Sequence, residues 1–193
     1  MHIDHKNQEI IFKIVYYGPG LGGKTTNIEY IHSHLDSKIR GELISFKTRQ
    51  ERTLYFDFLE LGFGRIDGKK PRFHLYTIPG QVHLGYGRKL VLKGADAVVF
   101  VADSQEDRLD ENLDSLADLE EKMALYNMSL SSFPWLLQYN KRDLPSAVPL
   151  SLLQKKLNFL NVDYLEAVAT RGTGVFPTLK AAIQKAVQHV STN

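Results

Sequence analysis

The fold is indicated by the stretch GPGLGGKT at residues 18–25, which matches the pattern G-x-x-x-x-G-K-[ST]. It follows an apolar run of strand length at residues 10–17 and precedes a segment of helical period at residues 25–35. Glycines let the backbone form a concave nest of N–H groups for phosphate oxygens, and the start of a helix adds its positive dipole end. The sequence therefore predicts a nucleoside-triphosphate site with contacts from Gly20, Leu21, Gly22, Gly23, Lys24, Thr25 and Thr26.

Two side chains of this loop have predicted roles of their own. In loops of this kind the lysine, here Lys24, reaches the β- and γ-phosphates and takes part in catalysis. The hydroxyl of Thr25 is placed to bind Mg²⁺. We therefore expect Mg²⁺ as a cofactor, with Thr25 as one of its ligands.

The rest of the chain alternates between strand-length apolar runs and helical patterns, as in an α/β domain whose sheet is mixed but mostly parallel. We expect strands at residues 10–17, 53–61, 72–78, 95–102, 135–139 and 163–168, and helices at residues 25–35, 112–126 and 176–190. Turn residues between positions 62 and 70 predict a hairpin, and hence one antiparallel pair at an edge of the sheet. Residues 1–193 contain no repeat or linker, so we expect a single domain with helices on both faces of the sheet.

Composition argues against several classes of protein. The formal net charge is only +2 and no Lys/Arg block is present, so no nucleic-acid binding is expected. The absence of cysteine excludes disulfides, zinc–thiolate centres and prenyl or palmitoyl anchors, and His2 in place of glycine excludes myristoylation. No run approaches the roughly 20 apolar residues that a membrane span needs. We therefore expect a cytoplasmic protein with no lipid anchor or membrane span.

A second motif, NKRD at residues 140–143, follows the strand expected at residues 135–139. Ligands of open α/β sheets lie at the carboxyl ends of the strands. The Asp143 carboxylate can accept hydrogen bonds from guanine N1–H and the 2-amino group, whereas adenine would leave it unpaired. Asn140 would hold the loop and Lys141 would lie along the base. Val168, Ala169 and Thr170 follow the last strand, where a backbone N–H can reach guanine O6. The predicted ligand is therefore GTP or GDP.

In this order the motifs resemble those of the Ras-like small GTPases over nearly the whole chain. The sequence is most similar to the MglA branch in four stretches: YYGPGL at 16–21, RTL at 52–54, FHLYTIPGQ at 73–81 and QYNKRD at 138–143. The resemblance implies a Ras-like P-loop GTPase domain that binds and hydrolyses GTP. It also implies a switch whose GTP-bound form controls cell polarity and surface motility, by gliding or type IV pili.

The same resemblance assigns roles to four residues of the two switch segments. Thr53 would meet Mg²⁺ and the γ-phosphate, and Gly80 would donate its backbone N–H to that phosphate. Gln81 would orient the attacking water, and Arg52 would enter the site as an arginine finger from the same chain. From the residues alone, Arg52 could equally be a solvated residue at the start of a strand. The implied partners are an MglB-like Roadblock-domain GTPase-activating protein, and polarity and motility effectors that meet the GTP form at a cell pole.

One residue departs from the general pattern of small GTPases. The usual D-x-x-G is TIPG at residues 77–80, so Thr77 replaces the aspartate that supports Mg²⁺ through water. A threonine can still hydrogen-bond a metal-bound water but brings no negative charge. MglA-type proteins share this threonine, so the change supports that branch. We expect Mg²⁺ binding to depend more on Thr25, Thr53 and the phosphates.

Three other functions agree less well with these motifs. A GTP-gated scaffold with negligible hydrolysis is the main alternative, although Arg52 and Gln81 argue against it. A phosphotransferase would need a lid and an acceptor pocket, and an ATPase is disfavoured by Asp143.

The seven histidines show no metal-binding spacing. The outer face of the edge strand, with Tyr55, Leu59 and Leu61, suits a partner surface unless a helix or the N-terminal segment covers it.

Overall fold

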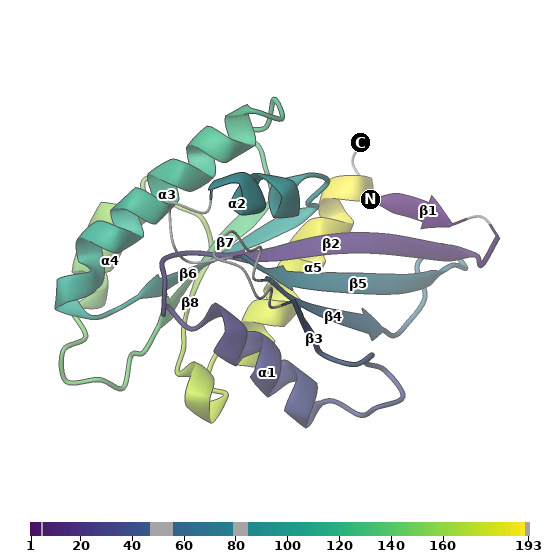
Figure 1. Ribbon diagram of the computed structural model, residues 1–193, viewed down its shortest axis with the longest axis horizontal. Coiled ribbons are helices and arrows are strands. Elements are labelled where there is room, and N and C mark those ends of the chain that lie inside the picture. The colour runs from purple at the N-terminus through teal and green to yellow at the C-terminus, as the bar shows by residue number, and fades with distance from the viewer. Residues whose placement is uncertain (5, 47–55, 79–84, 192–193) are drawn as a thin grey trace.

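The computed structural model describes residues 1–4, 6–46, 56–78 and 85–191. Its centre is an 8-stranded sheet in which seven strands follow the order β3-β4-β5-β2-β6-β7-β8, with β1 beside β2 (Figure 1). The strands are β1 (His2–Asp4), β2 (Glu9–Tyr17), β3 (Ile44–Phe46), β4 (Phe56–Gly62), β5 (Lys70–Thr77), β6 (Ala97–Asp103), β7 (Trp135–Asn140) and β8 (Tyr164–Glu166). The predicted α/β class is confirmed.

Most of the sheet is parallel, as predicted. The strand β2 pairs in parallel with both β5 and β6, and β7 continues the parallel part to β8. The predicted hairpin is present, since β4 and β5 are antiparallel. Two further antiparallel pairs were not foreseen: β1 with β2, and β3 with β4. The short strand β3 therefore occupies the edge beside β4.

Helices cover both faces of the sheet (Figure 1). On one face α1 (Lys24–His34) and α5 (Val175–Ser191) pack over one core, and on the other α2 (Gly85–Leu92), α3 (Leu109–Ala124) and α4 (Leu150–Leu157) pack over a second. Successive strand residues point to opposite faces, so Ile14 joins the first core and Val15 the second. Two short 3₁₀ helices, η2 (Glu106–Arg108) and η3 (Ala169–Arg171), follow β6 and β8.

Four of the strands and α-helices were not predicted from the sequence, namely β1, β3, α2 and α4. The two strands have three residues each, too few for a visible alternation. The helix α2 contains Gly85 and Gly87 in its first turn, and glycine is a poor helix former. The helix α4 has eight residues and follows Pro149, so its helical period is short. Short elements of this kind are specified by packing more than by local pattern.

The proposed outer apolar face of the edge strand was wrong for the residues that the structure describes. Leu59 and Leu61 are completely buried, in the core beneath α1 and α5. The residues of β4 that alternate with them, such as Phe58, are only partly buried. Tyr55 lies outside the described residues. A helix covers this strand face, which was the alternative explanation.

Within the described ranges, none of the helices is both long enough and apolar enough to cross a membrane.

Candidate functional site

The glycine-rich loop connects the end of β2 to the start of α1, as its sequence predicted. Gly18 has φ +138°, and a Cβ there would collide with the carbonyl of Val101 on the neighbouring strand. Only glycine fits this position without strain. The buried Lys24 ammonium donates to the carbonyls of Gly18 (3.0 Å) and Pro19 (2.6 Å). The lysine is therefore held at the start of α1, against the loop that it closes.

The buried surroundings of Lys24 favour an anionic ligand. The pKa of its ammonium is lowered from an ordinary 10.5 to about 7, mainly by burial and also by the positive charge of Arg88, while Asp57 acts in the opposite direction. A buried cation without a full counter-charge gains most from a phosphate, which supplies the missing negative charge. The helix α1 directs its first N–H groups to the same place.

On the base side, one side chain connects three motifs. The Asn140 amide at the end of β7 donates to the carbonyl of Gly22 at 2.9 Å. Its oxygen accepts the backbone N–H of Ala169 at 3.0 Å. A Cβ at Gly23, whose φ is +101°, would collide with the Asn140 amide, so the close approach requires glycine. Asn140 thus fixes the glycine-rich loop, its own loop and the segment after β8 relative to one another.

A cavity of about 180 Å³ lies between these three segments. It is lined by the predicted residues Leu21, Gly23, Thr26, Asn140, Lys141, Asp143, Val168, Ala169 and Thr170, together with Leu144. The Lys141 ammonium lies 2.5 Å from the Asp103 carboxylate at the end of β6, and Asp143 faces Arg171 at 3.4 Å. Because Ala169 gives its N–H to Asn140, the neighbouring Thr170 is the better candidate to meet a ligand oxygen.

On the metal side the structure adds a residue that sequence analysis missed. The Asp57 carboxylate of β4 is nearly buried and accepts hydrogen bonds from Thr25 Oγ1 (2.6 Å), Thr77 Oγ1 (2.8 Å) and Ser45 Oγ (2.8 Å). The Asp57 backbone N–H donates in turn to Thr77 Oγ1, at 2.9 Å. A carboxylate absent from position 77 is therefore supplied from the adjacent strand. The signal was present, since Asp57, Leu59 and Leu61 are every second residue of β4 and therefore share one strand face, which is buried.

These donors fit Mg²⁺. The ion prefers oxygen ligands, keeps several waters, and is usually held by one or two carboxylates together with substrate phosphates. Thr25, Asp57 and Thr77 bring two hydroxyls and one carboxylate to one point beside the glycine-rich loop. Among the described residues no group of three or more His, Cys, Asp or Glu side chains could hold a metal. The donor set therefore favours a hard ion shared with phosphates over a cage of protein ligands.

Four predicted site residues lie outside the described residues, namely Arg52, Thr53, Gly80 and Gln81. Their assigned roles stay predictions. The flanking positions are described: β4 begins at Phe56, β5 ends at Thr77, and α2 begins at Gly85. Asp57 lies at the start of β4, and Thr77 is the last residue of β5. These are the strand ends that lead into the two segments.

Comparison with known proteins identifies the family of the chain. Residues 4–190 match the ADP-ribosylation factor (Arf) family. The chain belongs to this family. It is 52% identical over 179 residues to the mutual gliding-motility protein MglA of Myxococcus xanthus (strain DK1622), covering 93% of this chain and 92% of that protein. The predicted MglA-type small GTPase is confirmed, and membership of a GTP-hydrolysing family supports GTPase activity.

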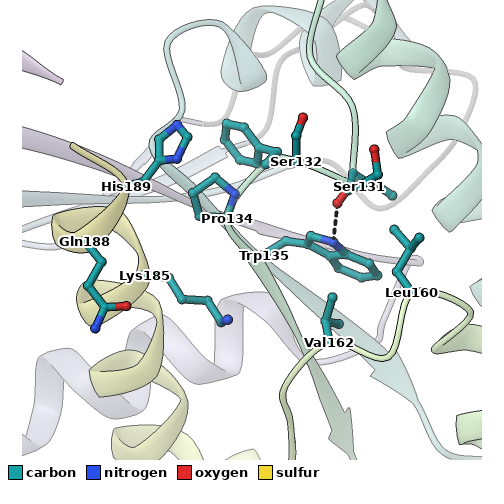
Figure 2. Close-up of a pocket in the computed structure, with 11 residues that line it drawn as sticks. Ser131, Ser132, Pro134, Trp135, Leu160, Val162, Lys185, Gln188 and His189 are labelled. Carbon is teal, nitrogen blue, oxygen red and sulfur yellow. Dashed lines mark hydrogen bonds between the residues drawn. The ribbon is translucent and has the colours of Figure 1, made fainter. Parts of the chain in front are cut away.

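A separate cavity of about 350 Å³ lies at the opposite end of β7 (Figure 2). Lys185, Gln188 and His189 reach it from α5, and Trp135 at the start of β7 forms one wall. The indole N–H of Trp135 donates to the Leu130 carbonyl at 2.9 Å, and Lys185 pairs with Asp163 at 2.8 Å. The Trp135 N–H and the Lys185 ammonium already have partners within the chain, and the cavity is distinct from the candidate nucleotide site.

Proposed function

We propose that this small GTPase binds GTP with Mg²⁺, hydrolyses it to GDP and phosphate, and controls cell polarity and surface motility in its GTP-bound form. The observation that carries the proposal is the Asn140 side chain, which joins the glycine-rich loop to the segments that border the base-sized cavity. An arrangement that couples phosphate and base recognition through one residue suits a nucleotide as a whole. Asp143 then selects guanine by accepting its N1–H and 2-amino hydrogens.

The remaining contacts have separate tasks in this proposal. The glycine-rich loop binds the phosphates through Gly20, Leu21, Gly22, Gly23, Lys24, Thr25 and Thr26. Lys141 covers the base, and Val168, Ala169 and Thr170 close its O6 edge, with the Thr170 N–H as the donor. Lys24 neutralises charge on the β- and γ-phosphates, and its nearly complete burial supports this role because water does not screen it.

Thr25 and Asp57 hold the proposed Mg²⁺ site, and Thr77 orients the Asp57 carboxylate by its hydrogen bond. The bound ion supplies charge neutralisation at the β- and γ-phosphates. Thr53 completes the site in the GTP form, a role that the resemblance to MglA-type proteins supports. Ser45 keeps the second Asp57 oxygen occupied, so the carboxylate presents one oxygen towards Thr25.

Hydrolysis is assigned to residues outside the described part of the chain. Gln81 orients the attacking water, Gly80 holds the γ-phosphate, and Arg52 stabilises the charge that develops in the transition state. An arginine finger contributes roughly 10³–10⁵ in rate where it operates. We propose that an MglB-like Roadblock-domain protein stimulates the reaction.

The biological role rests on the relative's printed name, a mutual gliding-motility protein. We propose that polarity and motility effectors bind the GTP form of this chain and that a cell pole recruits it from the cytoplasm. A GTP-gated scaffold with negligible hydrolysis is the competing proposal, and it predicts the same binding site.

The decisive experiment is single-turnover hydrolysis of preloaded GTP, with and without a Roadblock-domain partner. We expect slow hydrolysis alone, a large acceleration with the partner, and neither loading nor hydrolysis in the Lys24→Ala variant. Arg52→Ala should load GTP normally and lose the acceleration. Loading without hydrolysis under both conditions would establish the scaffold instead. ATP that competes equally with GTP for loading would refute the guanine assignment.

A further inference from the structure

The most unusual buried group outside the proposed contacts is the guanidinium of Arg88 on α2. Its side chain is completely buried. Nη1 lies 2.8 Å from the Asp118 carboxylate of α3, and Nη2 donates to Ser115 Oγ at 2.9 Å. The guanidinium also lies over the ring of Tyr17, 4.6 Å from its centroid. Arg88 therefore connects α2, α3 and the last residue of β2.

This cluster lies directly beneath the glycine-rich loop. Tyr17 immediately precedes Gly18, and its hydroxyl donates to the same Asp118 carboxylate. Arg88 Nη2 also donates to the Gly18 carbonyl, at 3.4 Å. That carbonyl is the one that accepts Lys24 Nζ at 3.0 Å. Two cations thus share one oxygen, and Arg88 helps to set where the loop begins and how its lysine is held.

Stability alone is a poor explanation for this arrangement. A buried ion pair often contributes no more than apolar residues of the same volume, because both charges lose their hydration. Arg88 Nε has no hydrogen-bond partner among the described residues, which adds to that cost. A charge kept at such a site is better explained by what it positions.

We propose that Arg88 is a positioning residue for GTP hydrolysis, which anchors the Tyr17–Gly18 junction to α3 and so holds the glycine-rich loop and Lys24 in the geometry that the phosphates need. This inference rests on the proposed function. It also makes α3 part of the phosphate site's support, because Asp118 and Ser115 hold Arg88 from that helix.

The test separates positioning from stability with the double variant Arg88→Met, Asp118→Asn. It removes both charges, while the introduced amide would keep an oxygen for the Tyr17 hydroxyl, so the melting temperature should stay close to that of the wild type. We expect single-turnover hydrolysis of preloaded GTP to be about tenfold slower, since a displaced phosphate loop loses rate even when folded. Wild-type melting together with a wild-type rate would overturn the proposal.

Two further variants complete the experiment. Lys122→Ala removes the other cation on Asp118, at 3.2 Å, and does not touch the loop, so its rate should stay within about twofold of the wild type. Ser115→Ala keeps Arg88 and removes one of the two Nη2 acceptors, while the Gly18 carbonyl remains, so a few-fold loss of rate is expected. If Ser115→Ala hydrolyses GTP at the wild-type rate, or Lys122→Ala slows it as much as the double variant, positioning by Arg88 is refuted. A wild-type protein that never hydrolyses GTP would instead refute the proposed function.

Discussion

The two sides of the candidate site are built differently. On the base side, Asn140 is the last residue of β7 and meets Gly22 and Ala169, which belong to segments predicted from the sequence. On the metal side, Thr25 of α1 and Thr77 of β5 meet at Asp57 of β4, which belongs to no motif. One side is made from short contiguous patterns and the other from single residues of three elements.

This difference shows which contacts a motif can preserve. Base recognition depends on backbone N–H groups and on a loop of fixed shape, so the residues must remain adjacent in sequence. A carboxylate near a metal needs only to reach one point in space, and a neighbouring strand can supply it. We therefore propose that the carboxylate of Asp57 compensates for the missing charge of Thr77 at this site.

The largest expected effect is that of a substitution on the base side alone. Asp143→Ala should weaken GTP binding by about 10³-fold, because the guanine N1–H and 2-amino groups lose their acceptor. The Mg²⁺ dependence of the remaining binding should not change. Competition titrations against a fluorescent guanine nucleotide measure both quantities. A loss of tenfold or less would contradict the assigned role of Asp143.

The matching change on the metal side is Asp57→Asn, which keeps size and removes charge. The Mg²⁺ concentration that half-stabilises bound nucleotide should rise about 10–100-fold, the range seen when a supporting group of a metal site is lost. Binding in the presence of a chelator should be unaffected. Glu60→Gln is the matched control, since Glu60 lies on the same strand and faces His74 instead. An unchanged Mg²⁺ titration would remove Asp57 from the site.

A smaller effect tests how the carboxylate is held. Thr77→Ala deletes the 2.8 Å hydrogen bond to the Asp57 carboxylate and the 2.9 Å bond from the Asp57 N–H. Because only the first of these acts on the carboxylate, Mg²⁺ support should weaken about fivefold, the equivalent of one ordinary hydrogen bond. Thr77→Ser keeps the hydroxyl and should titrate as the wild type does. If both variants behave alike, the hydroxyl at position 77 is not what orients Asp57.

The smallest effect is a pH dependence on the phosphate side. With a pKa of about 7 in the free protein, the Lys24 ammonium loses its proton as the pH rises through 7, while bound phosphate requires the charged form. GTP binding should therefore take up a proton at pH 8 and weaken by about fourfold between pH 6 and pH 7.5. Below pH 6 the lysine is charged in both states and the dependence should vanish. Calorimetric titrations in buffers of different ionisation enthalpy measure the uptake, and none at pH 8 would contradict the lowered pKa.

Six of the strands and the helices α1, α3 and α5 could be predicted, most of them because they have a clear period and enough residues, whereas the three-residue strands β1 and β3 could not. The parallel core follows from apolar runs such as residues 95–102, which become the fully buried β6. The elements that were missed are short, and Leu59 and Leu61 were assigned to the wrong environment. An alternating strand has two possible faces, and only the position of α1 decides which of them is covered.

By itself, the sequence determined the glycine-rich loop, the NKRD loop and the family, because these depend on residues that are neighbours along the chain. Only the tertiary structure decided that Asp57 stands beside Thr25 and Thr77, and that Arg88 and Lys24 share the Gly18 carbonyl. Apart from the contact of Lys24 with Gly18, these contacts join residues that lie far apart in the sequence and on different elements. Local patterns carry no information on such distances, which the pairing of strands and the packing of α2 on α3 establish.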